Sequence, residues 1–329
     1  MDSDDAHAWI AARSEGLRDL ACVMAALSLD LPAALTRPCS LDVLCQRLTL
    51  PVERLGCLVD ALCWMGLLQE QNGQLEMTAS GRRLLTDLRL RPRLASAGLG
   101  AEAWLGLATT IRSGQAQPMP DWPEWATAAV AQPLQERTLD LARQLWALLP
   151  VEVDACFHLV DMGSGKGIHA RAFLEHFERG RVTCLDRRPM LEQARAELTQ
   201  AQLSHRVQLT PVDLLDHPLE LAADGVLISD VLHSYGPAQA CQILQQAASI
   251  LRPGGLLVVK DLLVDRSGQL PRVGNDFSLH MMVHGMPGRA HAPDRVRGWI
   301  EAMGFEDVRE LAGEWAQLGC FVWLAQRPR

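Results

Sequence analysis

The amino-acid sequence predicts an α/β fold with a parallel, doubly wound sheet in its C-terminal half and an α-rich domain before it. From Val151 onward, apolar runs typical of buried strands alternate with amphipathic stretches typical of helices. Glycines at 163, 165 and 167 follow the first of these runs and precede a helical pattern. Residues 1–95 contain helical patterns and an Asn-Gly hairpin signal instead. We therefore expect domains at 1–95 and 151–329, joined by a helical connector at 96–150.

The individual elements follow from hydrophobic periodicity. In the N-terminal domain, 16–36 has helical spacing, Ser40 is an N-cap residue before a short helix, and 52–68 is a further helical pattern. A hairpin turning at Asn72-Gly73 follows, and three helices with a hairpin are typical of a winged helix. The connector contains helical patterns near 101–112 and 132–149. The expected strands of the C-terminal domain lie near 157–162, 181–186, 206–210, 225–230 and 255–262, with an antiparallel edge pair near 307–311 and 319–326.

Composition restricts the class of protein. The 329 residues are 48% hydrophobic and 21% charged, which describes an ordinary globular chain long enough for two cores. The net charge of −8 argues against a nucleic-acid or membrane surface, because phosphate contacts need clustered Lys and Arg. The 9 cysteines include no C-x-x-C pair, so we interpret them as core residues in a reducing compartment. We expect a cytoplasmic protein without a signal peptide or membrane span.

The glycine turn predicts a nucleoside site. Gly163 and Gly165 leave room for a ligand where a Cβ would stand. A dinucleotide fingerprint would place its third glycine at 168, which is isoleucine here. The turn, preceded by Asp161, instead resembles motif I of the S-adenosylmethionine methyltransferases.

Further cofactor contacts are expected where the next strands end. Asp186 ends the second strand, 19 residues past Gly167, where a ribose-hydroxyl acceptor is placed in α/β nucleoside sites. Asp213, with Leu214 beside it, follows the third strand and could face the adenine. These residues predict S-adenosyl-L-methionine as the cofactor.

Two further motifs are similar to those of the plant and bacterial small-molecule O-methyltransferases. Met77-Thr78-Ala79-Ser80-Gly81-Arg82-Arg83-Leu84 resembles that family's "LTP.G..L" element after the wing, and Leu232-His233-Ser234-Tyr235 resembles its "LHDW" element. The resemblance covers almost all of the chain. It implies a class I, seven-strand methyltransferase fold, a winged-helix domain that forms a homodimer, and a small aromatic substrate typical of secondary metabolism.

The resemblance also assigns residue roles. His233 matches the family's general base, and Asp261 falls where the family has a glutamate that holds the histidine's other nitrogen. Ser229 stands where some members have a cofactor-contacting lysine. Chemistry supports the first assignment, because a phenol with a pKa near 10 is mostly neutral at pH 7 and neutral imidazole can remove its proton.

The acceptor region departs from the family pattern. Residues 276–291 resemble its acceptor-lining helix and the turn after it, which implies substrate contacts from Met281, Met282, His284 and His291. Ala290 stands where the family has a second glutamate, so a two-acid clamp on the base is absent. His280 and His284 are four residues apart, but no acid of an H-E-x-x-H motif lies between them, and methyl transfer needs no metal. We expect no metal site.

Alternatives remain open. The same fold could methylate nitrogen or carbon, or use the bound cofactor for non-methylating chemistry. A different class of protein, a winged-helix transcription regulator that senses a ligand, is also compatible with the pattern. DNA binding is the weaker interpretation, because residues 1–95 contain 12 Asp and Glu against 10 Arg, and the helix at 52–68 carries a single arginine, Arg54.

Overall fold

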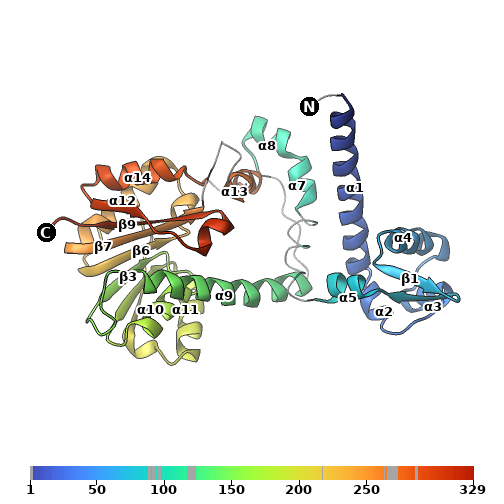
Figure 1. Ribbon diagram of the computed structural model, residues 1–329, viewed down its shortest axis with the longest axis horizontal. Helices are drawn as coiled ribbons and strands as arrows, with labels where there is room; N and C mark the ends of the chain where they lie inside the picture. The colour runs from blue at the N-terminus through green and yellow to red at the C-terminus, as the bar shows by residue number, and fades with distance from the viewer. Residues whose placement is uncertain are drawn as a thin grey trace. The chain divides into compact units, whose positions relative to one another are not determined.

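The structure is a computed structural model that describes residues 3–87, 90, 94, 98, 100–116, 124–216, 218–262, 264, 273–285 and 288–329 (Figure 1). The described chain divides into two compact units, Met1–Leu105 with Met119–Pro133 and Gly106–Pro118 with Leu134–Arg329. Among the described helices, none has the length and hydropathy needed to cross a membrane.

The first unit combines helices of 4 to 26 residues with a small hairpin. Its elements are α1 (Ser3–Ser28), α2 (Leu31–Ala34), α3 (Leu41–Leu48), α4 (Val52–Trp64), β1 (Leu68–Gln71), β2 (Gln74–Met77), α5 (Ala79–Thr86) and α7 (Ala101–Leu105). The hydroxyl of Ser40 accepts a hydrogen bond from the Val43 amide and caps α3. Asn72 and Gly73 both have positive φ, which is the backbone that a tight hairpin turn requires. The Asn-Gly hairpin was predicted from the sequence and is confirmed.

Two boundary predictions in this unit were wrong. The helix expected over 16–36 begins at Ser3 and ends at Ser28 as α1, because Asp30 has a φ of +54° and separates it from α2. The helix expected to run to residue 68 ends at Trp64, and Leu67 and Leu68 belong to the core as the hairpin begins. The physical reason is Gly66, whose φ of +70° ends the helix and turns the chain into β1.

The second unit contains the sheet. Its elements are α8 (Leu107–Ser113), α9 (Glu124–Ala147) from Leu134 onward, β3 (His158–Met162), α10 (Ile168–His176), β4 (Arg181–Asp186), α11 (Arg188–Gln200), β5 (Val207–Pro211), β6 (Ala223–Ser229), α12 (Pro237–Ile250), β7 (Leu251–Leu262), α13 (Val273–Val283), α14 (Pro293–Ala302), β8 (Glu306–Glu310) and β9 (Cys320–Gln326). Within the described residues, seven strands form one sheet in the order β5-β4-β3-β6-β7-β9-β8. Strands β3 to β7 pair in parallel, and β9 pairs antiparallel with both β7 and β8.

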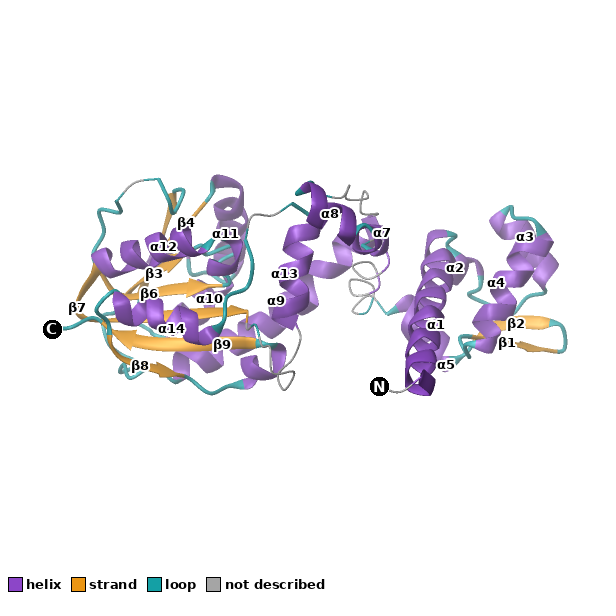
Figure 2. Cartoon of the chain, turned by 90° about the horizontal axis from the view of Figure 1, so that it is seen from above, coloured by secondary structure: helices purple, strands orange, loops and turns teal. Residues whose placement is uncertain are grey.

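Helices cover both faces of this sheet, as Figures 1 and 2 show. Side chains from α9, α10 and α11 share one core cluster, in which Phe173 packs edge-on against Trp146 with 5.2 Å between ring centroids. Side chains from α12 and α14 form the core on the opposite face. The doubly wound sheet with an antiparallel edge pair is therefore confirmed.

The connector differs from expectation. The helix predicted at 101–112 is broken at Gly106 into α7 and α8. The helix predicted to start at 132 begins earlier, at Glu124, as α9. Pro133 lies inside this helix and does not interrupt it. Part of the proline-rich segment before α9 lies outside the described residues.

Candidate functional site

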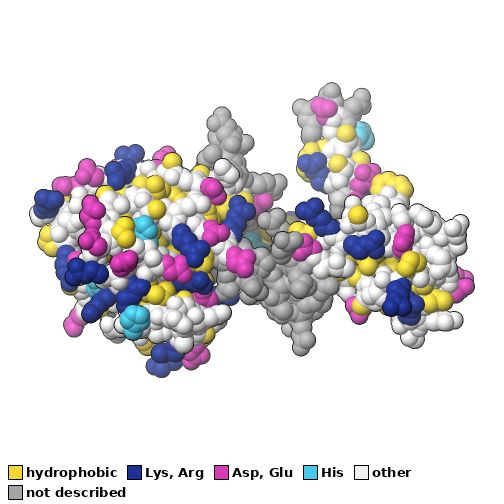
Figure 3. All heavy atoms as spheres, turned by 60° about the horizontal axis from the view of Figure 1, so that its bottom comes forward, with side chains coloured by type: hydrophobic (Ala, Val, Ile, Leu, Met, Phe, Trp, Pro, Cys, Tyr) yellow, Lys and Arg dark blue, Asp and Glu magenta, His cyan; other side chains and the backbone are white. Residues whose placement is uncertain are grey.

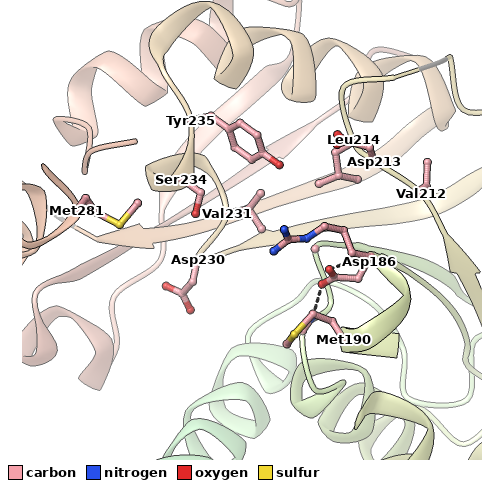
Figure 4. A pocket seen from close by; sticks show the side chains of 13 residues that line it. Asp186, Met190, Val212, Asp213, Leu214, Asp230, Val231, Ser234, Tyr235 and Met281 are labelled. Carbon is pink, nitrogen blue, oxygen red and sulfur yellow. Dashed lines mark hydrogen bonds between the residues drawn. The ribbon is translucent and has the colours of Figure 1, made fainter. Parts of the chain in front are cut away.

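A cavity of about 590 Å³ opens at the carboxyl ends of β3, β4, β5 and β6 (Figure 4). This is where open α/β sheets bind their ligands, at the point where the strand order reverses. Its lining comprises Gly163, Gly165, Asp186, Arg187, Met190, Val212, Asp213, Leu214, Asp230, Val231, Ser234, Tyr235 and Met281. The structure thus brings together five of the predicted cofactor residues: both glycines, Asp186, Asp213 and Leu214.

The glycine turn forms one wall of this cavity, which we call the nucleoside cavity. Gly163 and Gly165 have φ of +80° and +53°, a backbone that residues with a Cβ rarely adopt. Amides of Gly163 and Ser164 donate to the Leu185 carbonyl, at 2.8 and 3.2 Å, and tie the turn to β4. A Cβ on Gly165 would project into open space. A ligand can therefore approach the backbone at Gly165 as closely as motif I requires.

Asp186 connects the turn to the end of β4. One carboxylate oxygen accepts from the Gly165 amide at 2.7 Å, and the other accepts from the Arg187 amide at 2.7 Å. Each oxygen retains a second lone pair, so the carboxylate can still accept from a vicinal diol. Asp213 lies across the cavity and accepts from the Leu215 amide at 3.0 Å. Figure 4 shows Tyr235 beside Asp213 and Leu214.

Asp161 and Ser229, the remaining predicted cofactor residues, are buried and lie outside the cavity lining. Asp161 is 2% exposed, and its Oδ2 has no hydrogen-bond partner among the described residues. Burial, and then the charge of Asp186, raise the pKa of Asp161 to about 7. Ser229 pairs with His169 and Asp230. A cofactor role for either residue stays a prediction.

A second, largely apolar cavity of about 450 Å³ lies beside the first, and we call it the acceptor cavity. Its lining comprises Thr138, Leu141, Leu145, His169, Asp230, His233, Lys260, Leu262, Phe277, Trp315, Leu318 and Cys320. Asp230 lines both cavities, so they adjoin at the end of β6. Enclosed apolar walls with a few polar groups are typical of sites for small organic ligands.

The predicted pair of His233 and Asp261 is formed. His233 lies in a single turn of 3-10 helix, Leu232–Ser234, and Asp261 lies near the end of β7. The imidazole Nδ1 is 2.6 Å from Asp261 Oδ1, and the His233 amide donates to Oδ2 at 3.0 Å. A carboxylate only accepts, so Nδ1 carries the hydrogen and Nε2 keeps its lone pair. The aspartate at 261 is therefore long enough to hold the Nδ1 of His233.

Two effects on the pKa of His233 oppose each other. Burial lowers the pKa of His233, but the hydrogen bond and charge of Asp261 outweigh burial and raise the pKa above its ordinary value. Phe277 packs edge-on against the imidazole with 4.9 Å between ring centroids. The ring is therefore held in one orientation by a carboxylate and an aromatic neighbour.

The residues predicted to contact the methyl acceptor do not lie together in the structure. Met281 lines the nucleoside cavity at the end away from Asp186 (Figure 4), whereas Met282 is 38% exposed. His291 is buried, and its Nε2 donates to the carbonyls of Leu232 and Tyr235 at 3.2 and 3.1 Å. His284 lies near the end of α13, edge-on to His280. A substrate contact by Met282, His284 or His291 stays a prediction.

Ala290, which was expected to leave the base without a second acid, is buried in the structure. Ala290 is 4% exposed, and its amide donates to the Ser278 hydroxyl at 3.2 Å. A buried methyl group here cannot clamp the base, so Asp261 is the carboxylate on His233.

Four polar residues of the acceptor cavity were not predicted from the sequence: Thr138, His169, Asp230 and Lys260. A signal existed for Lys260, because it is a charged side chain inside the apolar run Leu256–Leu262 and one of only two lysines in the chain. Asp230 directly follows β6, where strand-end acids are informative. His169 follows the glycine turn and carries no comparable signal.

Comparisons with known proteins agree with this geometry. The family model described as an O-methyltransferase domain matches residues 126–306. The mitomycin biosynthesis 6-O-methyltransferase of Streptomyces lavendulae is 33% identical over 126 residues, 38% of this chain and 36% of that protein. The acetylserotonin O-methyltransferase of Bos taurus is 26% identical over 217 residues, 63% of this chain and 62% of that protein. The bacteriochlorophyllide d C-20 methyltransferase of Chlorobaculum tepidum is 23% identical over 89% of this chain and 90% of that protein.

Solved structures share the fold over nearly the whole chain. The mitomycin 7-O-methyltransferase structure has a TM-score of 0.75 at 23% identity, covering 98% of both chains. The human N-acetylserotonin methyltransferase, solved in complex with S-adenosylmethionine, has a TM-score of 0.71 at 20% identity and covers 100% of both chains. The family model spans more than half of the chain. The protein therefore belongs to the O-methyltransferase family defined by that domain.

Proposed function

We propose that the protein is an S-adenosylmethionine-dependent methyltransferase that methylates a hydroxyl group on a small, largely apolar aromatic metabolite, with His233 as general base. One observation carries the proposal: a buried imidazole, oriented by a carboxylate, lines an apolar cavity that adjoins the nucleoside cavity at Asp230. The curated relatives quoted above support the reaction class by their names.

The nucleoside cavity fits the cofactor. The backbone at Gly163 and Gly165 gives close approach, Asp186 offers lone pairs for the ribose hydroxyls, and Asp213 with Leu214 would face the adenine. When bound, S-adenosylmethionine supplies an electrophilic sulfonium methyl group. The chain must then hold that methyl group towards Asp230, where the cavities adjoin.

His233 performs the proton step in this proposal. Because Asp261 fixes the hydrogen on Nδ1, the lone pair of Nε2 accepts the proton of the acceptor hydroxyl as the oxygen attacks. The imidazolium that forms lies 2.6 Å from a carboxylate, which stabilises it. Asp261 is thus a positioning residue that acts through His233.

The acceptor cavity selects for an apolar skeleton. Leu141, Leu145, Phe277 and Trp315 supply walls that exclude water, and Trp315 is 1% exposed. A ring that enters displaces water from these walls, which is favourable in proportion to the apolar area covered. Exclusion of water also strengthens the electrostatic interaction between His233 and Asp261.

Two measurements test the proposal. Titration calorimetry of the purified protein with S-adenosylmethionine and S-adenosylhomocysteine should show uptake of both, and labelled methyl groups should appear on a panel of phenols. Replacing His233 by alanine should lower turnover by about 10²- to 10⁴-fold, the usual contribution of a general base, with cofactor uptake retained. Absence of nucleoside uptake by folded protein would end the proposal.

Carbon is the second candidate acceptor atom. The bacteriochlorophyllide d C-20 methyltransferase, a relative that matches over 89% of this chain, favours it. Mass spectrometry of the methylated product separates the two, because an O-methyl ether and a C-methyl arene fragment differently. Retention of full turnover in His233→Ala would instead favour a nitrogen acceptor with a free lone pair.

We also propose that the N-terminal domain, residues 1–95, forms a homodimer. In support, α1 leaves Trp9, Ile10 and Leu17 between 47% and 58% exposed, which groups large apolar side chains on one helix. Light scattering coupled to size-exclusion chromatography should give twice the mass of the chain. Replacing Ile10 and Leu17 together by glutamate should lower that mass to one chain, whereas Val43→Glu, on α3, should not.

The ligand-sensing regulator remains the rival from another class. On the face in Figure 3, basic and acidic side chains are interspersed, which is not the clustered basic surface that phosphate contacts need. A gel-shift titration at moderate salt tests this rival directly. Sequence-specific binding that resists salt would overturn the enzyme proposal.

A further inference from the structure

An ion pair lies in the wall of the acceptor cavity. Lys260, on β7, places its Nζ 2.6 Å from Oδ2 of Asp230, which directly follows β6. The Asp230 amide also donates to the Lys260 carbonyl at 2.8 Å. The Lys260 side chain is 9% exposed and that of Asp230 is 41% exposed. The two residues are therefore fixed to each other, with the carboxylate accessible from both cavities.

Asp230 is held in an unusual backbone conformation. Its φ is +58°, in the left-handed region that residues with a Cβ seldom adopt. Such backbone strain persists only where surrounding contacts enforce it, and it clusters at ligand sites. Here the bonds to Lys260 enforce it, and the result is a carboxylate placed at the junction of the cavities.

The polar wall continues beyond the ion pair. The Ser229 hydroxyl donates to Asp230 Oδ2 at 3.2 Å and lies 3.1 Å from Nε2 of His169. Burial and the charge of Lys260 lower the pKa of His169 to about 4, so its ring is neutral. His169 Nδ1 has no partner within the described part of the chain. The wall thus contains a neutral imidazole that is linked to Asp230 through the Ser229 hydroxyl.

Hydrogen-bond counting shows what Lys260 and Asp230 can bind. An ammonium has three donors, and the described residues give Lys260 Nζ one hydrogen bond, to Asp230. A hydroxyl group can accept from Lys260 and donate to Asp230 at the same time. A carboxylate could accept from Lys260 but would be repelled by Asp230, and a C–H group would satisfy neither.

The distance between these groups bears on the position of that hydroxyl on the acceptor. A ring nitrogen of His233 and carboxylate oxygens of Asp230 and Asp261 all lie within 4.8 Å of one another. Groups this close can face the two oxygens of a vicinal diol on one ring.

We propose that Asp230 and Lys260 are specificity-determining residues that recognise a second hydroxyl group, adjacent on the aromatic ring to the hydroxyl that is methylated. This inference rests on the proposed O-methyltransferase function and adds the substitution pattern of the acceptor.

The test compares three probes on one skeleton: 2,3-dihydroxynaphthalene, 2-naphthol and 3-hydroxy-2-naphthoate. Methyl transfer is measured as kcat/KM with saturating S-adenosylmethionine. The diol should exceed 2-naphthol by about 10- to 100-fold, because a site built to bond a hydroxyl discriminates against an analogue that lacks it. The carboxylate should be the poorest acceptor of the three.

Variants identify the residues responsible. In Lys260→Met, which keeps the length of the side chain without its donors, the ratio of diol to 2-naphthol should fall towards one. Lys260→Arg should keep most of the ratio, since it retains a charged donor. Asp224→Asn is the matched control, because Asp224 forms an ion pair with Arg252 at the opposite end of β6. Its ratio should equal that of the wild type.

The outcomes are distinguishable. Equal kcat/KM for diol and 2-naphthol in the wild type, or an unchanged ratio in Lys260→Met, would overturn the inference and leave the proposed function intact. Methylation of none of the probes, with cofactor uptake intact, would count against both. The ratio cancels changes in the amount of folded enzyme. If Lys260→Met folds poorly, Asp230→Asn gives an independent measurement of the same ratio.

Discussion

Replacing Asp261 by asparagine should disable the base while keeping the shape of the site. Asp261 accepts two hydrogen bonds from His233, from Nδ1 at 2.6 Å and from the backbone amide at 3.0 Å. The Leu262 amide also donates to Oδ1, at 2.7 Å. Asparagine offers one acceptor oxygen, so its NH₂ group must face one of the two His233 donors. If NH₂ faces the ring, the imidazole must move its hydrogen to Nε2, and the lone pair that accepts the substrate proton is lost.

The energy of one charged hydrogen bond sets the expected magnitude. A hydrogen bond to a charged group contributes about 1.5–3 kcal/mol, and each 1.36 kcal/mol in an activation barrier is about tenfold in rate. Loss of one such bond in the transition state therefore predicts a fall in kcat of about 10- to 150-fold, and the wrong tautomer adds to it. The apparent pKa of the base should also fall, because Asp261 is what raises the pKa of His233 against burial.

The assay is transfer of labelled methyl groups between about pH 5 and 9, the range in which histidine titrates. The KM for S-adenosylmethionine should stay unchanged, because Asp261 does not line the nucleoside cavity. Asp224→Asn again serves as control, since it removes an acid from the same sheet far from His233. A kcat within about threefold of wild type, with the acid limb of the profile unmoved, would refute this reasoning.

Further predictions concern the wild-type profile, the glycine turn and the core. In the wild type, kcat should rise with pH through an apparent pKa above 6.5, because the raised pKa of His233 keeps the base protonated below it; activity independent of pH would contradict this. Gly163→Ala places a Cβ 2.5 Å from Val231 Cγ2 at positive φ and should lower stability by about 1–3 kcal/mol in thermal unfolding. Gly165→Ala meets no neighbour, so calorimetry should show weaker cofactor uptake with a smaller loss of stability. Phe173→Ala, in the core beside Trp146, should cost about 3–5 kcal/mol by urea unfolding.

The sheet was predictable because parallel strands are buried on both faces. A strand such as β4 (Arg181–Asp186) then appears in the sequence as a continuous apolar run, and its bounds matched the prediction. The end of α4 was not predictable, because Leu67 and Leu68 continue the helical spacing of apolar residues. Only the positive φ of Gly66, which is a tertiary outcome, separates helix from hairpin.

Some residues of the candidate site were also predictable from the sequence, and others were not. Asp186, Asp213 and the glycines could be predicted, because the carboxyl ends of parallel strands meet at one edge of a sheet. The ion pair of Lys260 and Asp230 could not, since it depends on the register in which β7 lies beside β6. His291 shows the limit of inference from motif position, because its imidazole bonds to the carbonyls of the turn that carries His233.

The charges of the acceptor cavity explain why Asp261 must be buried behind His233 rather than in the cavity wall. Among the described lining residues, Lys260 and Asp230 offset each other, and a neutral His233 leaves the charge of Asp261 unbalanced. S-adenosylmethionine would supply a sulfonium charge in the adjoining cavity, which would offset the charge of Asp261. If His233 is the base, as proposed, it would take up a positive charge when the acceptor loses its proton. Asp261, 2.6 Å from Nδ1, would stabilise that charge better than an acid exposed in the cavity.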